Sequence, residues 1–302
     1  MSTSTSPGTV AEMPAPTAGA AASRQAGSRR RRRFRPAVDL PLLVLLAAFV
    51  LPIVWLVVLS VQPGRNIVSP DWEFGFTTAN IAELLGPGRP FAAQLVNSLL
   101  IVAGTIVLCL VVGSATGYAL SRLQLARWVT LTLLAVSAVL PLIPPMALVP
   151  GLYVTLNNLG LLGSVQGLIL LNTVFNLPFS ALLMKVYFDG VPGELREAAV
   201  VDGASELRVF LQVMVPLARS GLAAVAVFVG IMAWNEFLMG LVMTSGGRTA
   251  PLTVGIASLV QPYEVAWGPM AAAGTLATVP IIVLALLANR QIISGLTGGA
   301  VK

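Results

Sequence analysis

Charged residues are scarce in this chain. Only 10% of its 302 residues are Asp, Glu, Lys or Arg, whereas 56% are hydrophobic. With a mean hydropathy of +0.87, such a chain cannot cover its surface with water-soluble side chains. The composition excludes an ordinary water-soluble globular protein and predicts an integral membrane protein.

Histidine is absent, and the single cysteine, Cys109, lies inside an apolar run. One thiol excludes an internal disulfide framework or thiol metal cluster, and the lack of histidine removes the commonest general base, metal ligand and pH switch. The chain also contains no G-x-x-x-x-G-K-[ST] phosphate loop. We therefore expect no catalytic residue, no metal site and no cofactor bound by this chain.

The first 28 residues are rich in Ser, Thr, Ala, Gly and Pro, and they precede the basic run Arg29–Arg33. A nucleic-acid patch and a twin-arginine export signal are alternatives for this run, but neither is favoured. The apolar stretch that follows has no convincing small-residue cleavage site, so we interpret the arginines as an anchor on the cytoplasmic side, beside anionic lipid. Residues 1–36 are predicted to be a disordered basic cytoplasmic tail, and residues 37–302 a transmembrane domain.

Six apolar runs are long enough to cross a bilayer core of about 30 Å. They lie at Leu40–Val61, Ala93–Leu120, Val129–Val149, Leu168–Val186, Leu222–Val242 and Met270–Leu287. With the N-terminus inside, three of the 18 Lys and Arg residues fall on the outer side, namely Arg65, Arg89 and Arg248. This asymmetry predicts that both termini are cytoplasmic in an all-α membrane protein with six transmembrane helices.

The third apolar run contains four prolines: Pro141, Pro144, Pro145 and Pro150. Each removes a backbone donor, so the helix should kink or unwind here. A packing kink and a flexible element beside a translocation path both remain open as explanations.

Four polar residues inside the predicted spans are candidates for lining a pathway: Asn172, Asn176, Asn235 and Glu236. For the two asparagines of the fourth span, hydrogen bonding between helices is favoured over ligand contact. A carboxylate at membrane depth costs roughly 2.5 kcal/mol or more, so Glu236 is favoured for a functional or gating role.

The segment between the fourth and fifth runs carries both signs of charge. A first helix can begin at Pro192 and end at Asp202-Gly203. Ser205 can cap a second, amphipathic helix that Pro216 ends or kinks. Its apolar residues recur at helical spacing, at Leu207, Phe210, Leu211 and Met214.

Glu197-Ala198-Ala199, followed by Gly203 and Pro216, closely resembles the EAA signature of permease subunits of binding-protein-dependent ABC importers. From about Leu42 onward the chain is similar to the sugar-class, maltose-type second subunit. Weaker matches follow in the family order: Asn97-Ser98-Leu99, Gly117–Arg122, Pro141 with Pro150, Gly160-Leu161-Leu162, Trp234–Phe237 and Gly295–Lys302. One departure is Ser220, where the family often has a second proline.

The resemblance implies that the charged segment is a cytoplasmic coupling helix that docks on an ATPase. The residues it assigns to this coupling are Glu197, Ala198, Ala199, Asp202, Gly203, Ala204, Phe210 and Pro216. In that family Glu197 would pair with a basic residue of the ATPase, and Phe210 would fill a pocket in its cleft. The tail after Gly295 is a further expected contact.

The implied function is a non-enzymatic permease subunit of a sugar or oligosaccharide importer in the bacterial cytoplasmic membrane. The implied partners are a second permease subunit, two ATPase subunits that bind ATP and Mg²⁺, and an extracytoplasmic sugar-binding protein, with lipid around them and no nucleic acid. The binding protein would meet the outer loops, at about residues 62–90 and 244–268. Two alternatives remain: the same machinery for a non-sugar solute, and a proton-coupled secondary transporter that uses Glu236.

Overall fold

The computed structural model describes residues 36–299 except positions 68, 70–72, 124, 246 and 264, with side chains from residue 39 to residue 286. The predicted N-terminal tail therefore lies outside the described residues, apart from Pro36. The chain forms two units, Met1–Val50 and Leu51–Lys302. The first contributes the beginning of α1 (Pro36–Ser60), and the second holds the sites discussed below.

Four continuous helices are long and apolar enough to cross a membrane. They are Asp39–Ser60 within α1, α4 (Phe91–Arg122), α7 (Val165–Asp189), and Trp267–Leu286 within α14 (Trp267–Gly299). These confirm the first, second, fourth and sixth predicted spans to within a few residues. The number of candidate spans rises to six if each of two bent helix pairs is one span.

The first bent pair is the proline-rich third run. Helix α5 (Arg127–Val139) continues into the 3₁₀ turn η1 (Leu140–Leu142), and α6 (Pro145–Asn158) then leaves at 108°. Since a proline disfavours helical backbone at the residue before it, the break falls at the Pro144-Pro145 pair. The predicted kink is confirmed.

The second bent pair contains α9 (Glu206–Val209), the π-helical segment η2 (Phe210–Met214) and α10 (Val215–Leu217) on one side, and α11 (Arg219–Trp234) on the other, at 78°. The chain resumes helix only at α12 (Leu238–Thr244). The fifth predicted span, Leu222–Val242, is therefore not one continuous helix. Helical structure stops after Trp234, for a reason given below.

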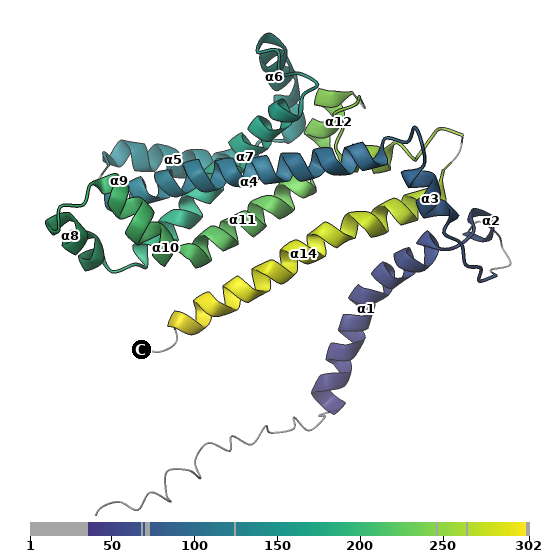
Figure 1. Cartoon of the computed structure of the whole chain (residues 1–302), viewed down its shortest axis with the longest axis horizontal. Helices are drawn as coiled ribbons and strands as arrows, with labels where there is room; N and C mark the ends of the chain where they lie inside the picture. The colour runs from purple at the N-terminus through teal and green to yellow at the C-terminus, as the bar shows by residue number, and fades with distance from the viewer. Residues whose placement is uncertain are drawn as a thin grey trace, which may run out of the picture. The chain divides into compact units, whose positions relative to one another are not determined.

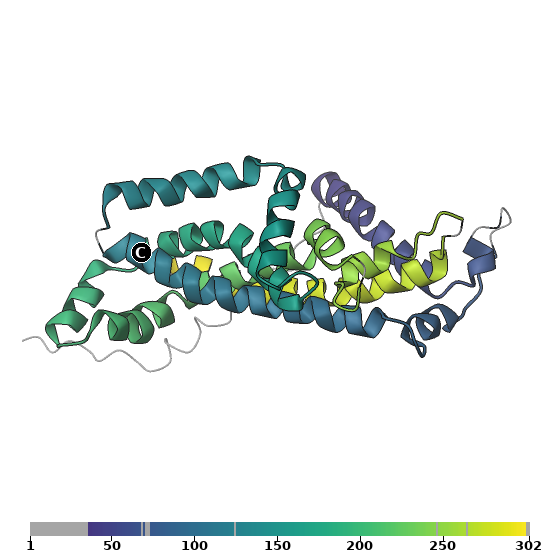
Figure 2. The same ribbon diagram turned by 90° about the horizontal axis from the view of Figure 1, so that it is seen from above.

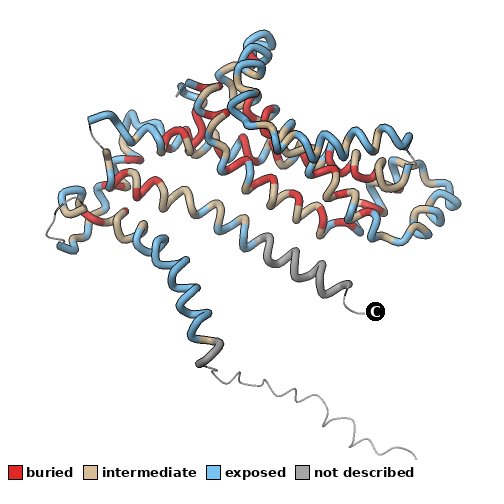
Figure 3. Tube along the Cα trace, turned by 180° about the vertical axis from the view of Figure 1, so that it is seen from behind, coloured by how far each residue is buried: buried red, intermediate tan, exposed pale blue. Residues whose placement is uncertain are grey.

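In the second unit, α4, α7, α11 and α14 pack side by side as a bundle (Figure 1). Helix α4 approaches α7 closely because Gly117 has no side chain: a Cβ there would lie 2.8 Å from the backbone oxygen of Ala181. Buried residues gather where these helices face one another, as Figure 3 shows in red. The only extended pairing among the described residues is a bridge between Val260 and Val265.

Short helices occupy the two opposite ends of this bundle. Helices α8 (Gly193–Val201), α9 and α10 lie at one end, and α2 (Gly64–Ile67) and α3 (Ala79–Leu85) lie at the other (Figures 1 and 2). Helix α13 (Leu252–Ala257) packs against α4 and α14. The connections at both ends of the bundle are thus folded into short helices.

Candidate functional site

The charged segment folds as two short helices joined by a tight turn, as predicted. Helix α8 follows Pro192 and ends at Asp202, and Gly203 adopts a left-handed φ of +83°. No atom lies within 4 Å of the position that a Cβ at Gly203 would take. Glycine is needed here for the backbone conformation and not for space inside this chain.

The second helix begins as predicted but is not a regular α-helix. The Ser205 hydroxyl accepts a hydrogen bond from the backbone N–H of Arg208, at 3.4 Å. The chain then widens into the π-helical η2, in which Val215 N–H bonds to Phe210 O. Because Pro216 has no N–H, it cannot complete an α-helical hydrogen bond to residue 212, and a π turn accommodates this loss.

Charged groups join the two helices to each other and to the bundle. Arg196 of α8 forms an ion pair with Glu206 of α9, and the Tyr118 hydroxyl of α4 donates to Glu206 Oε2 at 2.6 Å. The hydrogen bond to Glu206 raises the pKa of the Arg196 guanidinium, so Arg196 remains charged. The segment is therefore fastened to α4 through Glu206.

A second connection fixes the point where this segment leaves the bundle. Arg122, in the last turn of α4, donates to the backbone oxygens of Phe188 and Val191. Beside it, Ser121 donates to Asp189 at 2.6 Å. From sequence, this stretch of α4 has only a resemblance to the family and no predicted role. A hydroxyl and a guanidinium directly after an apolar run could have indicated that these two residues bond to a neighbouring loop.

The predicted coupling residues fall into an exposed group and a packed group. Glu197, Ala198, Asp202 and Gly203 are exposed, as is Pro216. Ala199 and Ala204 pack against the core of the bundle. Glu197 and Asp202 form no ion pair with any other described residue. Their carboxylates are therefore free to meet a partner.

Phe210 packs partly against the chain's own core. Its ring lies 5.1 Å from that of Tyr118 and 6.3 Å from that of Phe188, and it is half-buried in the chain's own core. The ring therefore packs partly against α4 and α7 of this chain, and its contact with a pocket of the ATPase stays a prediction. The large apolar side chains exposed here are others: Val201 is 86% exposed, Leu207 67% and Leu211 54%.

The two asparagines of α7 also differ from expectation. The Asn172 amide donates to Leu168 O at 2.9 Å, and the Asn176 amide donates to Asn172 O at 2.8 Å. Both bonds lie within one helix, so the favoured hydrogen bonding between helices is not what satisfies these amide donors. Each side chain reaches the carbonyl one turn back, which spacing alone does not reveal.

Glu236 explains the break between α11 and α12. Its carboxylate accepts hydrogen bonds from the backbone N–H groups of Met239 (2.7 Å) and Gly240 (3.0 Å). These are donors that the first turn of α12 would otherwise leave without an acceptor. The neighbouring Asn235 amide donates to Ile231 O at 2.8 Å, at the end of α11. Two polar residues therefore terminate one helix and begin the next.

The structure brings two of the four pathway candidates together. Glu236 and Asn172 line one very small cavity of about 10 Å³ between α4, α7 and α11. The rest of its lining is Ser98, Ile101, Leu168, Ala233 and Pro251. Asn176 and Asn235 are not part of this lining.

Comparison with known proteins identifies the chain's family. The model of the family described as "binding-protein-dependent transport system inner membrane component" matches residues 110–297. The chain belongs to this family. It is therefore a permease, a non-enzymatic membrane component of a transport system that works with an ATPase and a binding protein.

Individual relatives cover most of this permease. It is 32% identical over 254 residues to the trehalose/maltose transport system permease protein MalG of Thermococcus litoralis, across 83% of this chain and 91% of that protein. It is also 32% identical to the trehalose transport system permease protein SugB of Mycobacterium tuberculosis, across 83% and 92%. A diacetylchitobiose uptake permease, NgcG of Streptomyces coelicolor, is 31% identical across 92% of each chain.

A solved structure shares the fold of this permease. It is a chain of a bacterial ABC transporter involved in the import of alginate, an acidic polysaccharide, with a TM-score of 0.72 at 20% identity. The match covers 87% of this chain and 98% of that one. An all-α, multi-pass inner-membrane protein is thus supported by composition, helices and fold alike.

Proposed function

We propose that this permease forms half of the translocation pore of an ATP-driven sugar or oligosaccharide importer. In this proposal a second permease subunit completes the pore, and two ATPase subunits bind ATP and Mg²⁺. An extracytoplasmic binding protein delivers the sugar. The names of three relatives, which concern trehalose, maltose and diacetylchitobiose, support a sugar over another solute. Family membership counts against a proton-coupled secondary transporter.

One observation carries the coupling role: the bundle end formed by α8 to η2 exposes apolar side chains beside free carboxylates. Val201, Leu207 and Leu211 are each more than half exposed. An exposed apolar cluster with a polar surround is typical of a surface that a partner covers. Glu197 and Asp202 offer charges that a basic partner could pair with. We call this surface, from Gly193 to Leu211, the docking segment.

The connections of the docking segment suggest how a movement of the ATPase reaches the membrane. Glu206 is bonded to Tyr118 of α4, and Val191 is bonded to Arg122 of the same helix. Helix α4 in turn packs along α7. A displacement of the docking segment would therefore carry the ends of α4 and α7 with it, and so alter the cavity that the bundle encloses.

The charge distribution supports an orientation. With the docking segment in the cytoplasm, both termini are also cytoplasmic, and Arg65, Arg89 and Arg248 are the outer Lys and Arg residues. The extracytoplasmic loops, at about residues 62–90 and 244–268, would then meet the binding protein. The expected contact of the tail after Gly295 with the ATPase falls outside the residues whose side chains are described.

Purification of the tagged permease from its native membrane in mild detergent tests this function. We expect a second permease and an ATPase in stoichiometric amounts by mass spectrometry, with ATP-dependent uptake of at least one of the three sugars after reconstitution. Scrambling residues 197–216 should remove the ATPase and leave the membrane-inserted permease. A lone chain that moves solute without ATP would contradict the proposal.

A further inference from the structure

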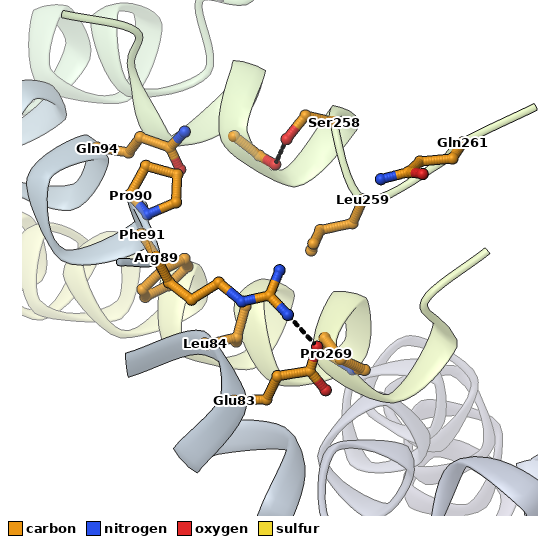
Figure 4. A pocket seen from close by; sticks show the side chains of 11 residues that line it. Glu83, Leu84, Arg89, Pro90, Phe91, Gln94, Ser258, Leu259, Gln261 and Pro269 are labelled. Carbon is orange, nitrogen blue, oxygen red and sulfur yellow. Dashed lines mark hydrogen bonds and ion pairs between the residues drawn. The ribbon is translucent and has the colours of Figure 1, made fainter. Parts of the chain in front are cut away.

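A pocket lies at the end of the bundle opposite the docking segment (Figure 4). Its cavity volume is about 200 Å³. This is below the ~300–1,000 Å³ of sites for drug-sized ligands, so the pocket is suited to a small ligand such as a single ring. Its lining comes from the end of α3, the first turn of α4, α13 with the loop after it, and the start of α14. Distant parts of the chain therefore converge to build it.

Gln94 is the buried polar group of this pocket. It is only 7% exposed, and its amide forms no hydrogen bond with the part of the chain that the structure describes. Figure 4 shows the amide end pointing toward the enclosed space. The amide lies over Gly255, where a Cβ would come within 1.9 Å of Gln94 Oε1. Gly255 thus leaves room for a side chain that offers one acceptor and two donors.

The charges of the pocket are already paired with each other. Arg89 and Glu83 form an ion pair at 2.7 Å on the rim, and both side chains are about half exposed. An ionic ligand would have to compete with this pair. A neutral hydroxylated ligand could instead use the guanidinium N–H groups that the pair leaves free and the second carboxylate oxygen. The pocket is therefore suited to an uncharged polar ligand.

Apart from Ser258 and Gln261, apolar side chains form most of the remaining wall. Leu84, Phe91 and Leu259 line the space, together with Pro90 and Pro269 (Figure 4). Such a wall would pack against the C–H faces of a ring whose edge carries hydroxyls. A sugar ring has apolar C–H faces and an edge of hydroxyl groups. The apolar walls would pack against its faces, and the buried amide and the charged groups at the rim would bond to its hydroxyls.

We propose that this pocket is a carbohydrate subsite, which holds one sugar ring at the extracytoplasmic mouth of the permease. The inference rests on the proposed function, which places sugar on this side of the membrane. The enclosed shape and the single buried amide favour a ring over an extended segment of the binding protein, which would require a row of backbone partners. The subsite would receive substrate before it enters the pore.

The test uses the reconstituted importer in lipid nanodiscs without its binding protein. Saturation-transfer NMR is recorded with maltose, trehalose and diacetylchitobiose. We expect transfer to ring protons of at least one of them, and a dissociation constant about tenfold higher in Gln94→Leu. Gly255→Ala should have the same effect, because its methyl group displaces the flexible amide end. Gln166→Leu, which replaces an exposed glutamine at the start of α7 outside the pocket, is the matched control.

Three outcomes would overturn the subsite. They are no transfer from any of the three sugars, equal transfer in the wild type and the Gln94→Leu and Gly255→Ala variants, or a loss of binding-protein association in Gln94→Leu with sugar transfer intact. Uptake is measured in parallel, so that the proposed function is judged separately. ATP-dependent uptake without saturation transfer overturns only the subsite, whereas no uptake of any of these sugars overturns sugar import itself.

Discussion

Helix α4 is fastened to a loop at each of its ends, but by different chemistry. Near its start, the Asn97 amide donates to the backbone oxygens of Arg248 and Ala250, at 3.0 and 3.1 Å. Near its end, Tyr118 donates to Glu206, which is itself paired with Arg196. At the start of α4 a neutral side chain holds backbone, whereas at its end the charged Arg122 holds backbone and an ion pair adds a further connection.

This difference indicates which end is built to change. Hydrogen bonds from a neutral amide to backbone are nearly independent of ionic strength, so the loop at the start of α4 should keep one geometry. Ion pairs between partly exposed groups are weaker and are screened by salt. The docking segment is therefore held firmly enough to move with α4 and weakly enough to adjust when a partner binds.

The largest effect is expected at the turn of the docking segment. Gly203→Asp forces a side chain onto a φ of +83° and adds a charge where the partner should dock. We expect ATP-dependent uptake to fall at least about tenfold, with normal amounts of protein in the membrane. Gly160→Asp is the matched control, since Gly160 has a φ of +67° and equally open space. Normal uptake by Gly203→Asp would contradict the docking role.

The substitution Glu236→Gln, at the break between α11 and α12, should have the next largest effect. Glu236→Gln replaces one of two acceptor oxygens by an NH₂ group, so the N–H of Met239 or Gly240 loses its acceptor. We expect uptake to fall about fivefold without a change in membrane insertion. Exposed Glu73 provides the control substitution, Glu73→Gln. Unchanged transport kinetics would leave Glu236 with a purely structural role.

Reversing a charge at the docking end tests the connection to α4. Arg196→Glu places a carboxylate against Glu206, and we expect sugar imported per ATP hydrolysed to fall about threefold. Adding Glu206→Arg restores the pair with the charges exchanged. The double variant should recover most of the lost coupling, which a general loss of stability would not allow. No recovery would show that the ion pair is not what transmits movement.

A change in salt concentration should produce the smallest effect, and it distinguishes the two ends of α4 directly. We expect hydrogen exchange in α8 to rise about twofold when KCl increases from about 0.05 to about 0.5 M, because the Arg196–Glu206 pair is screened. The Leu252 amide, which donates to Ser98 at 2.8 Å, should not respond. An equal response at both ends would remove the distinction between them.

Much of this architecture could be predicted from sequence, because membrane spans depend on composition and length alone. The ends of α8 were also predictable, since Pro192 and Gly203 act through their own backbone. Pro216 predicted that the helix ends or kinks, but not the 78° bend after Leu217. The break after Trp234 was missed because Asn235 and Glu236 lie between two apolar stretches that together have the length of one span. Glu236 and its capping bonds stop the helix there.

The candidate site was less predictable, because its contacts join distant parts of the chain. Tyr118 and Glu206 are 88 positions apart, and no local pattern relates them. Phe210 has the spacing of an exposed docking residue, but the π turn of η2 and the packing of α4 determine the side on which its ring lies. Helix periodicity identifies an apolar face, but it does not show whether that face packs against this chain or against a partner.

The π turn of η2 has a consequence for how the length of this segment can vary. A π turn is an α-helix with one additional residue accommodated in its winding. Loss of one residue from Phe210–Met214 would restore an α-helical turn while the flanking helices keep their orientation. The same deletion inside α8 or α11 would rotate everything beyond it by about 100°. Among relatives, η2 is therefore a position where a one-residue gap can be tolerated without disturbing the surface on either side.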